Sequence, residues 1–324
     1  MKDIDHRLCI APMMTHTDRH FRFFLRLISR CVMLYTEMVT TGALIHGGRR
    51  QRLEYNESEH PLGLQLGGSD PRELAAATRM AAEHGYDEVN LNVGCPSDRV
   101  QTGRFGACLM TEPQCVADCV AAMAAAADVP VTVKTRIGID HKDSYADLCH
   151  FITTVAASGC RTFIIHARKA WLQGLSPRQN RDIPSLEYDR VYRIKADFPD
   201  LEVIINGGIH TLEEARGHLR HVDGVMIGRA ACNNPYLLAG ADTLLFGDPR
   251  PARSRQAVLD AFMHYAEEQL ARGVSLHSMT RHLLGLYQGQ AGARAFRRHL
   301  SNGAVRPDAG IDVLTKAARL ISAA

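Results

Sequence analysis

The sequence predicts an α/β protein, a (β/α)8 TIM barrel, with a small all-helical domain at the C-terminal end. Eight short apolar runs recur along the first part of the chain, each followed by a polar or glycine-bearing turn and, mostly, a helical pattern. Strands that alternate with helices form a parallel sheet, and eight of them close into a barrel. An open doubly wound sheet is disfavoured because no G-x-G-x-x-G follows the first run.

The expected strands are, in chain order, Leu8–Pro12, Met33–Tyr35, Leu62–Leu66, Glu88–Leu91, Val131–Thr135, Thr162–His166, Glu202–Asn206 and Gly224–Ile227. Helical patterns between them include Pro71–His84, Pro113–Ala127 and Ser144–Ser158. Two of these helices open on a proline, which the first turn of a helix accepts.

The pattern changes after residue 248, where Pro249 and Pro251 interrupt the chain. Four helices are expected beyond them, at Ser254–Arg272, Leu276–Gln290, Ala293–Leu300 and Asp312–Ile321. We therefore predict a barrel domain over residues 1–248 and a helical domain over residues 249–324.

Composition points to a soluble protein with reduced thiols. Of 324 residues, 46% are hydrophobic and 23% are charged, and the nine cysteines include no C-x-x-C pair. We expect no metal site, no disulfide framework and a cytoplasmic setting. Met1–Asp5 begins no apolar leader, and the longest alanine-rich run, Val120–Ala127, is too short for a bilayer, so no membrane contact is expected.

Charge is distributed unevenly along the chain. From residue 271 onward, eight Lys/Arg face two Asp, a net charge of +6, whereas the preceding residues carry −3. A basic tail on a mildly acidic body favours a polyanionic partner docked at the C-terminal end. The alternative is a solvated helical face.

The stretch Asn90-Leu91-Asn92-Val93-Gly94-Cys95-Pro96 carries the strongest chemical signal. Asn90 and Asn92 share one strand face because side chains alternate along a strand. Two amides at a strand end suit a polar planar ligand, such as a flavin ring or a nucleobase, because buried amides need hydrogen bonds. Cys95 beside such a ligand can act as an acid or a nucleophile, whereas alone it would be read as a buried cysteine in a turn.

Other strand ends carry polar or catalytic side chains too. They are Pro12-Met13-Met14, Glu37, Gln65, Lys134 and Arg136, His166, Asn206-Gly207-Gly208 and Gly228-Arg229. The two glycine turns follow the seventh and eighth strands, where barrels commonly bind phosphate. Lys134 and Arg136 share a face and predict an anionic ligand, such as a reduced flavin, unless Lys134 pairs with an acid such as Glu37.

These motifs together resemble the tRNA-dihydrouridine synthases. The resemblance rests on Ala11-Pro12-Met13-Met14, the Asn90–Pro96 stretch, Val133–Gly138, His166-Ala167-Arg168, Asn206-Gly207-Gly208 and Gly228-Arg229. Pro96–Gln101, Phe105–Met110 and Ala167–Pro177 are similar to the bacterial A-type branch, and the resemblance spans essentially the whole chain.

The resemblance implies an FMN-dependent reductase with NADPH as electron source. It would reduce the C5–C6 bond of D-loop uridines in tRNA, at positions 20 and 20a, with hydride passing from flavin N5 to C6 and a proton from Cys95 to C5. The barrel would then be the FMN-binding catalytic domain and the tail the tRNA-binding domain, with no protein partner implied. A free thiol is mostly protonated at neutral pH, so it can serve as an acid.

The family's functional positions carry over as follows. FMN contacts fall on Pro12, Met13, Met14, Gln65, Lys134, His166, Asn206, Gly207, Gly208, Gly228 and Arg229. Contacts with tRNA fall on Asn90, Asn92, Arg136, Arg178, Arg181, Arg294 and Arg297.

Two other functions compete with this hypothesis. One is an FMN barrel reductase of a free pyrimidine, of the dihydroorotate or dihydropyrimidine dehydrogenase type, although a small substrate needs no basic tail. The other is a catalytically idle RNA-binding protein, against which the intact flavin and cysteine positions argue.

Overall fold

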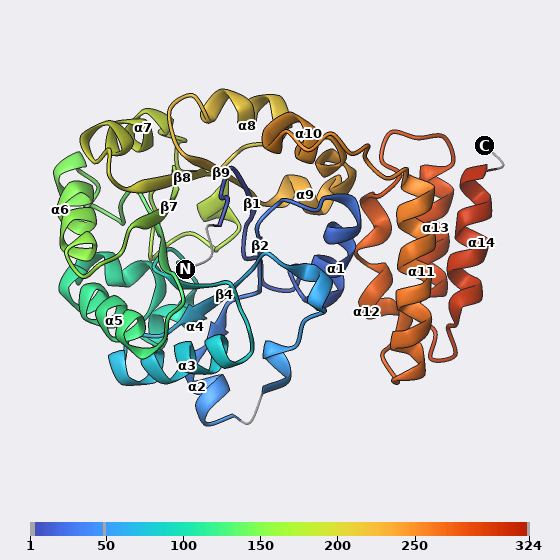
Figure 1. The fold of residues 1–324 in the computed structure, drawn as a ribbon, viewed down its shortest axis with the longest axis horizontal. Helices are drawn as coiled ribbons and strands as arrows, with labels where there is room; N and C mark the ends of the chain where they lie inside the picture. The colour runs from blue at the N-terminus through green and yellow to red at the C-terminus, as the bar shows by residue number, and fades with distance from the viewer. Residues whose placement is uncertain (1–3, 48–49, 323–324) are drawn as a thin grey trace.

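The chain forms a closed parallel barrel with a cluster of helices beside it (Figure 1). The computed structural model describes residues 4–47 and 50–322, so part of the N-terminal segment used above to exclude a leader lies outside the described residues. The strands are β1 Leu8–Ile10, β2 Leu34–Tyr35, β3 Val39–Thr40, β4 Leu62–Gly67, β5 Glu88–Asn92, β6 Val131–Arg136, β7 Thr162–His166, β8 Glu202–Asn206 and β9 Gly224–Ile227. Within the described residues they follow the order β1-β9-β8-β7-β6-β5-β4-β2, with β3 paired to β4.

Backbone hydrogen bonds close the ring between β1 and the residue before β2. Ile10 N–H donates to the Met33 carbonyl at 2.8 Å, and Met33 N–H donates to Leu8 at 3.0 Å. All eight predicted strands are confirmed, and so is the TIM barrel. The two-residue strand β3 was not predicted.

Helices cover the outside of the barrel between the strands. They are α1 Arg19–Ile28, α2 Thr41–Ile45, α3 Pro71–Glu83, α4 Asp98–Thr102, α5 Pro113–Ala126, α6 Tyr145–Ala156, α7 Tyr188–Asp197, α8 Leu212–His218, α9 Arg229–Asn233 and α10 Ala241–Phe246. The three helices named from the sequence are confirmed. Their starts follow from local chemistry, since Asp70 caps α3 ahead of Pro71, and Ser144 and Asp147 form a capping box on α6.

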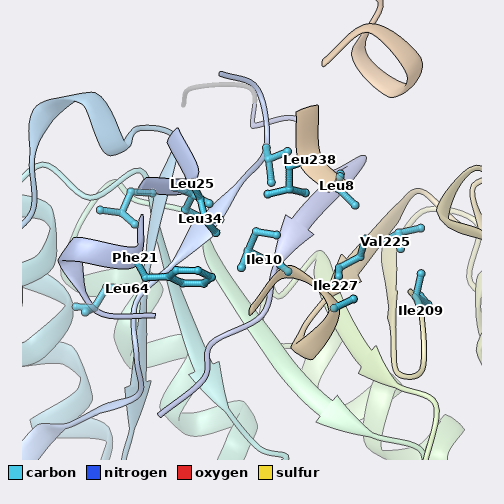
Figure 2. Close-up of a cluster of buried hydrophobic side chains, with 14 of the residues drawn as sticks. Leu8, Ile10, Phe21, Leu25, Leu34, Leu64, Ile209, Val225, Ile227 and Leu238 are labelled. Carbon is cyan, nitrogen blue, oxygen red and sulfur yellow. The ribbon is translucent and has the colours of Figure 1, made fainter. Parts of the chain in front are cut away.

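The main core lies between the barrel wall and these helices. Figure 2 shows Phe21 and Leu25 of α1 among strand residues such as Leu8, Ile10 and Leu64, and all five side chains are buried. Burying side chains of this size stabilises the fold by about 1.5–3 kcal/mol each. Outward positions on the strands are therefore committed to packing. Inward positions form a second, smaller apolar cluster that includes Met33, Ile164 and Met226, and the polar side chains of the site.

The tail contains α11 Arg255–Ala271, α12 Leu276–Thr280, α13 Ala293–Gly303 and α14 Ile311–Ser322. Three of the four predicted tail helices are confirmed, but the prediction of one helix over Leu276–Gln290 is wrong. After α12 the chain makes only a 3-10 turn at Leu283–Gly285.

Two glycines explain this break. A side chain at Gly285 would stand 2.4 Å from the Asn233 carbonyl oxygen, so the backbone must pass close to the end of α9. Gly289 adopts φ +77°, which an α-helix does not use.

Helix α1 joins the barrel to the tail. Phe23 stacks on Tyr265 with ring centroids 3.9 Å apart, and Asp18 forms ion pairs with Arg281 and with His282, the latter at 3.0 Å. The expected boundary at residue 248 falls between α10 and α11, and the division into two domains stays a prediction. Among the described residues, no helix has both the length and the apolar character that crossing a membrane requires.

Candidate active site

Five neighbouring strands bring polar side chains together at the mouth, where their carboxyl ends meet. Cross-strand neighbours in this register are Gln65 and Asn90, Asn92 and Lys134, Arg136 and His166, and His166 and Asn206. The remaining predicted residues follow β1 and β9, which pair with each other: Pro12, Met13 and Met14 after one, Gly228 and Arg229 after the other. The predicted barrel residues therefore gather at one end of the barrel.

Three amides form a hydrogen-bonded row inside the mouth. Asn92 Nδ2 donates to Gln65 Oε1 at 2.8 Å, and Gln65 Nε2 donates to Asn90 Oδ1 at 2.8 Å. Asn90 Nδ2 in turn donates to Thr132 Oγ1 at 2.8 Å. Because each amide is held at both ends, the row presents a fixed polar surface.

Cys95 stands immediately above this row. Its backbone N–H donates to Asn92 Oδ1 at 3.0 Å, and its Sγ lies 3.4 Å from Ser97 Oγ. Its carbonyl accepts from Ala107 N–H at 2.9 Å, and a side chain at Gly106 would come within 2.6 Å of that carbonyl oxygen. Cys95 is half-buried rather than part of the core, so its loop is held firmly while the thiol remains at the mouth.

Lys134 is a cation without an acidic partner. Its Nζ donates to Asn206 Oδ1 at 3.0 Å, and in the described part of the chain it forms no ion pair. Burial, aided by the charge of Arg136, lowers the pKa of Lys134 to about 7. The alternative of a salt bridge to Glu37 is wrong, since Glu37 instead accepts from the Thr15 backbone N–H. An anionic ligand bound beside Lys134 would pair with its ammonium group and favour the charged form.

Arg136 is 3% exposed and holds neighbouring loops together. Its guanidinium donates to the carbonyls of Gly94 at 2.8 Å, Lys169 at 3.1 Å and Asn180 at 3.2 Å. These bonds tie the loop of Cys95 to the loop after β7. A direct contact of Arg136 with tRNA stays a prediction.

The turn after β8 has no room for side chains. Gly207 adopts φ +119° and Gly208 φ +69°, and a side chain at Gly207 would stand 2.7 Å from His166 Cδ2. Burial and the charges of Arg136 and Lys134 lower the pKa of His166 well below its usual value, so its ring is neutral. Bare backbone beside a neutral ring can approach a bound anion closely.

Arginines form a positive rim around the mouth. Arg229 pairs with Asp182 at 2.8 Å, and the exposed Arg178 and Arg181 lie in or beside the 3-10 turn Gln179–Arg181. Arg168 keeps its Nε buried without a hydrogen-bond partner among the described residues. A buried N–H without a partner is costly, and an anion placed here would satisfy it.

The structure does not bring the tail arginines to the mouth. Arg294, Arg297 and Arg298 are exposed on α13, whose opposite face buries Phe296 and Leu300. Figure 1 shows α13 among the tail helices, beside the barrel rather than over it. Within residues 4–47 and 50–322 these three arginines form no hydrogen bond or ion pair.

The sequence interpretation missed the residues below the mouth. Thr132 and Glu88 lie two residues before Lys134 and Asn90 on the same strand faces, and Thr132 Oγ1 donates to Glu88 Oε1 at 2.6 Å. The alternation that identified the strand-end residues, extended by one step, would have found both.

The described residues at the opposite end of the barrel form a weaker candidate for a ligand or metal site than the mouth does. A hollow of about 350 Å³ there is lined by Asp5, Arg7 and Phe246, among others. Cys31, Asp242 and Asp248 lie close enough together nearby to hold a metal ion. The two carboxylates already accept hydrogen bonds from backbone and arginine N–H groups, which leaves them poor ligands.

Sequence comparison identifies close relatives over nearly the whole chain. A model of the family described as dihydrouridine synthase (Dus) matches residues 9–322. The tRNA-dihydrouridine(20/20a) synthase of Shewanella oneidensis is 61% identical over 313 residues, covering 97% of this chain and 93% of that protein. Those of Vibrio cholerae and Escherichia coli strain K12 are 59% and 57% identical, covering 96% and 98% of this chain and 95% and 92% of their own.

A solved structure shares the fold alone. A 2-naphthoyl-CoA reductase in complex with 2-naphthoyl-CoA superposes with a TM-score of 0.59 at 10% sequence identity. The match covers 76% of this chain and 52% of that one, so this chain spans about half the length of that reductase.

Proposed function

Because the chain belongs to the dihydrouridine synthase family, we propose that it reduces the C5–C6 double bond of D-loop uridines in tRNA, giving 5,6-dihydrouridine at positions 20 and 20a. The observation that carries this proposal is the half-buried Cys95 thiol, held beside three amides and the unpaired cation Lys134. A planar, polar substrate and a proton donor are what that arrangement suits.

The family is flavin-dependent, and we assign FMN as the cofactor. The residues fit it on three counts: Lys134 lacks an acidic partner, Gly207 and Gly208 leave bare backbone, and Arg168 Nε is buried without a partner in the described chain. One terminal phosphate suits such a turn, and the chain contains no adenine-binding motif. When bound and reduced, FMN supplies the hydride.

The FMN contacts we assign are Pro12, Met13, Met14, Gln65, Lys134, His166, Asn206, Gly207, Gly208, Gly228 and Arg229. Lys134 contributes a positive charge at the site, and its link to Asn206 at 3.0 Å positions that charge.

Cys95 is the general acid. It gives its proton to C5 of the base, and Ser97 Oγ at 3.4 Å from Sγ helps to orient the thiol. Asn92 accepts from the backbone N–H groups of Gly94 and Cys95, which fixes the thiol relative to the amide row.

The target uridine must leave its stack to reach this pocket, because the mouth of a barrel admits a base and not a folded tRNA. Arg178 and Arg181 lie at the rim where the nucleotide would enter, and the exposed Arg294 and Arg297 offer a second basic surface on the tail. Contacts of this kind go to phosphates and are sequence-independent.

NADPH is the electron donor we assign. The described residues form one sheet and no separate dinucleotide-binding unit, so NADPH and tRNA would use the same pocket in turn and give ping-pong kinetics. The nine thiols are all unpaired, which suits the reducing cytoplasm, and we assign the enzyme to that compartment.

The test is reduction of an unmodified tRNA transcript by NADPH, with dihydrouridine mapped by position. We expect product at positions 20 and 20a, a yellow protein whose released cofactor co-migrates with FMN, and no turnover of free uridine or dihydroorotate. Turnover of the free pyrimidine instead of tRNA would support the dehydrogenase alternative, and absence of any flavin would refute both.

A further inference from the structure

Tyr188, the first residue of α7, contacts the glycine turn that follows β8. Its hydroxyl donates to the Gly207 carbonyl oxygen at 2.8 Å. Burial raises the pKa of Tyr188, so the hydroxyl is protonated at neutral pH and acts as the donor. A side chain at Gly208 would stand 3.0 Å from the same hydroxyl oxygen, so Tyr188 packs directly against the peptide between the two glycines.

This peptide has no other hydrogen bond in the part of the chain that the structure describes. Its carbonyl, on Gly207, accepts from Tyr188, and its N–H, on Gly208, donates to no described group. Glycine adopts positive and negative φ about equally, so two adjacent glycines allow the peptide to turn over. The Ala167 N–H holds the Asn206 carbonyl at 2.8 Å, which fixes only the preceding peptide. Among the described residues, Tyr188 is therefore the hydrogen-bond partner that sets the orientation.

The orientation decides which group the turn offers to a ligand. The carbonyl and the N–H of one trans peptide point in opposite directions. Because the Gly207 carbonyl is held by a residue of α7, on the outside of the barrel, the Gly208 N–H points away from that helix. A bare N–H in the turn after this strand is a donor for phosphate, whereas a peptide that had turned over would present a carbonyl oxygen and repel an anion.

Cations beside the turn favour an anionic ligand at this place. The Nε of Arg168 is buried without a hydrogen-bond partner among the described residues. Arg168 lies close enough to Tyr188 for its charge to oppose the rise in the Tyr188 pKa, and close enough to Arg229 for the two charges to repel each other. An anion here would accept from the Arg168 Nε and from the Gly208 N–H, which both lack a partner in the described chain.

The Tyr188 ring is held by contacts that do not involve its hydroxyl. His218 meets it in a T-shaped contact with ring centroids 4.6 Å apart, and the Nδ1 of His218 lies 2.6 Å from the Tyr192 hydroxyl oxygen. The Glu187 N–H donates to the Ala167 carbonyl at 2.8 Å, which ties the start of α7 to the end of β7. Removal of the hydroxyl alone should therefore leave the ring in place.

We propose that Tyr188 is a positioning residue whose hydroxyl holds the Gly208 N–H toward the phosphate of the cofactor, so that the pocket prefers a phosphorylated flavin to riboflavin. This inference rests on the proposed function and adds a residue that selects the form of its cofactor. Riboflavin has the same ring and side chain as FMN but no phosphate, so it gains nothing from an oriented N–H in this turn.

The test is titration of FMN and of riboflavin into apoprotein, followed by flavin fluorescence. Tyr188→Phe keeps the ring and removes the hydroxyl. We expect its Kd for FMN to rise roughly 2- to 10-fold, the range of one hydrogen bond, and its Kd for riboflavin to stay at the wild-type value. An equal rise for both flavins would show a general structural role and overturn the inference, as would an unchanged Kd for FMN.

Tyr192→Phe is the matched control on the same helix. Its hydroxyl contacts His218 and, within the described residues, no group of the glycine turn. This variant should bind both flavins as the wild type does, and a loss of FMN affinity as large as that of Tyr188→Phe would overturn the inference. Inorganic phosphate should compete with FMN for the wild-type apoprotein, and should compete less well for Tyr188→Phe.

A measurement on the wild-type apoprotein covers the case in which Tyr188→Phe does not fold. If glycine is labelled at its carbonyl carbon and its nitrogen, a triple-resonance spectrum selects the amides that follow a glycine, and the chain has three such pairs, at Gly47-Gly48, Gly67-Gly68 and Gly207-Gly208. The Gly208 signal should shift most when inorganic phosphate is added. A shift no larger than those of the other two pairs would overturn the inference. Failure of the wild-type apoprotein to bind either flavin would instead refute the proposed function.

Discussion

Binding of reduced FMN, whose ring carries a negative charge, should take up a proton at Lys134, and the amount follows from the structure. Burial and the charge of Arg136 lower the pKa of Lys134 to about 7, so about half of the apoprotein carries the charge at pH 7. An anionic cofactor favours the charged form and returns the pKa toward 10.5. Uptake should therefore be roughly 0.5 proton at pH 7 and roughly 0.9 at pH 8.

The assay is anaerobic isothermal titration of reduced FMN into apoprotein, in buffers that differ in ionisation enthalpy, at both pH values. The dependence of the apparent binding enthalpy on buffer gives the number of protons taken up. Lys134→Met should lose this uptake and bind FMN more weakly, whereas Lys142→Met, an exposed lysine beyond the same strand, should behave as wild type.

The same pKa sets the sign of the stability change with pH. Because the pKa of Lys134 is lower in the folded apoprotein than in the unfolded chain, the unfolded state binds more protons between about pH 7 and 10.5. The apoprotein should thus gain stability as pH rises through that window, and Lys134→Met should remove the gain. Equal proton uptake by wild type and Lys134→Met would refute the assignment of Lys134 to the anionic part of the cofactor.

Three further outcomes are expected. Cys95→Ala should keep NADPH oxidation and slow tRNA reduction by about 10²–10⁴-fold, as stopped-flow traces of the two half-reactions would reveal; near-normal reduction would remove Cys95 from the mechanism. Gly207→Ala, forced to φ +119°, should destabilise the apoprotein by about 1–3 kcal/mol and weaken FMN binding, whereas Gly217→Ala, with nothing within 4 Å of its added carbon, should do neither. Arg294→Ala/Arg297→Ala should leave NADPH oxidation intact, weaken tRNA binding and reduce the salt slope by about one unit per lost phosphate contact; normal binding across a salt series would make the tail a solvated surface.

What the sequence could predict depended on local patterns. Alternation along a strand gave the barrel and placed Asn90 and Asn92 on one face, and both follow from backbone geometry alone. The predicted helix over Leu276–Gln290 is interrupted at Gly285, where the backbone passes close to Asn233. That contact is between residues far apart in the sequence, so no local pattern could predict it. The partners of Arg136 were equally hidden, because they are carbonyls on two loops whose paths are set by the whole fold.

Strand β5 connects the candidate site at the mouth to the floor of the barrel. Glu88, Asn90 and Asn92 share its inner face, and Cys95 follows in the next turn, so one strand connects the buried pair of His6 and Glu88 to Cys95. A polar column through a barrel costs free energy wherever a group lacks a partner, which is why each of its side chains is hydrogen-bonded. Because every group needs a partner, the donors along this network all lie on the mouth side of their acceptors, from Asn92 down to Glu88.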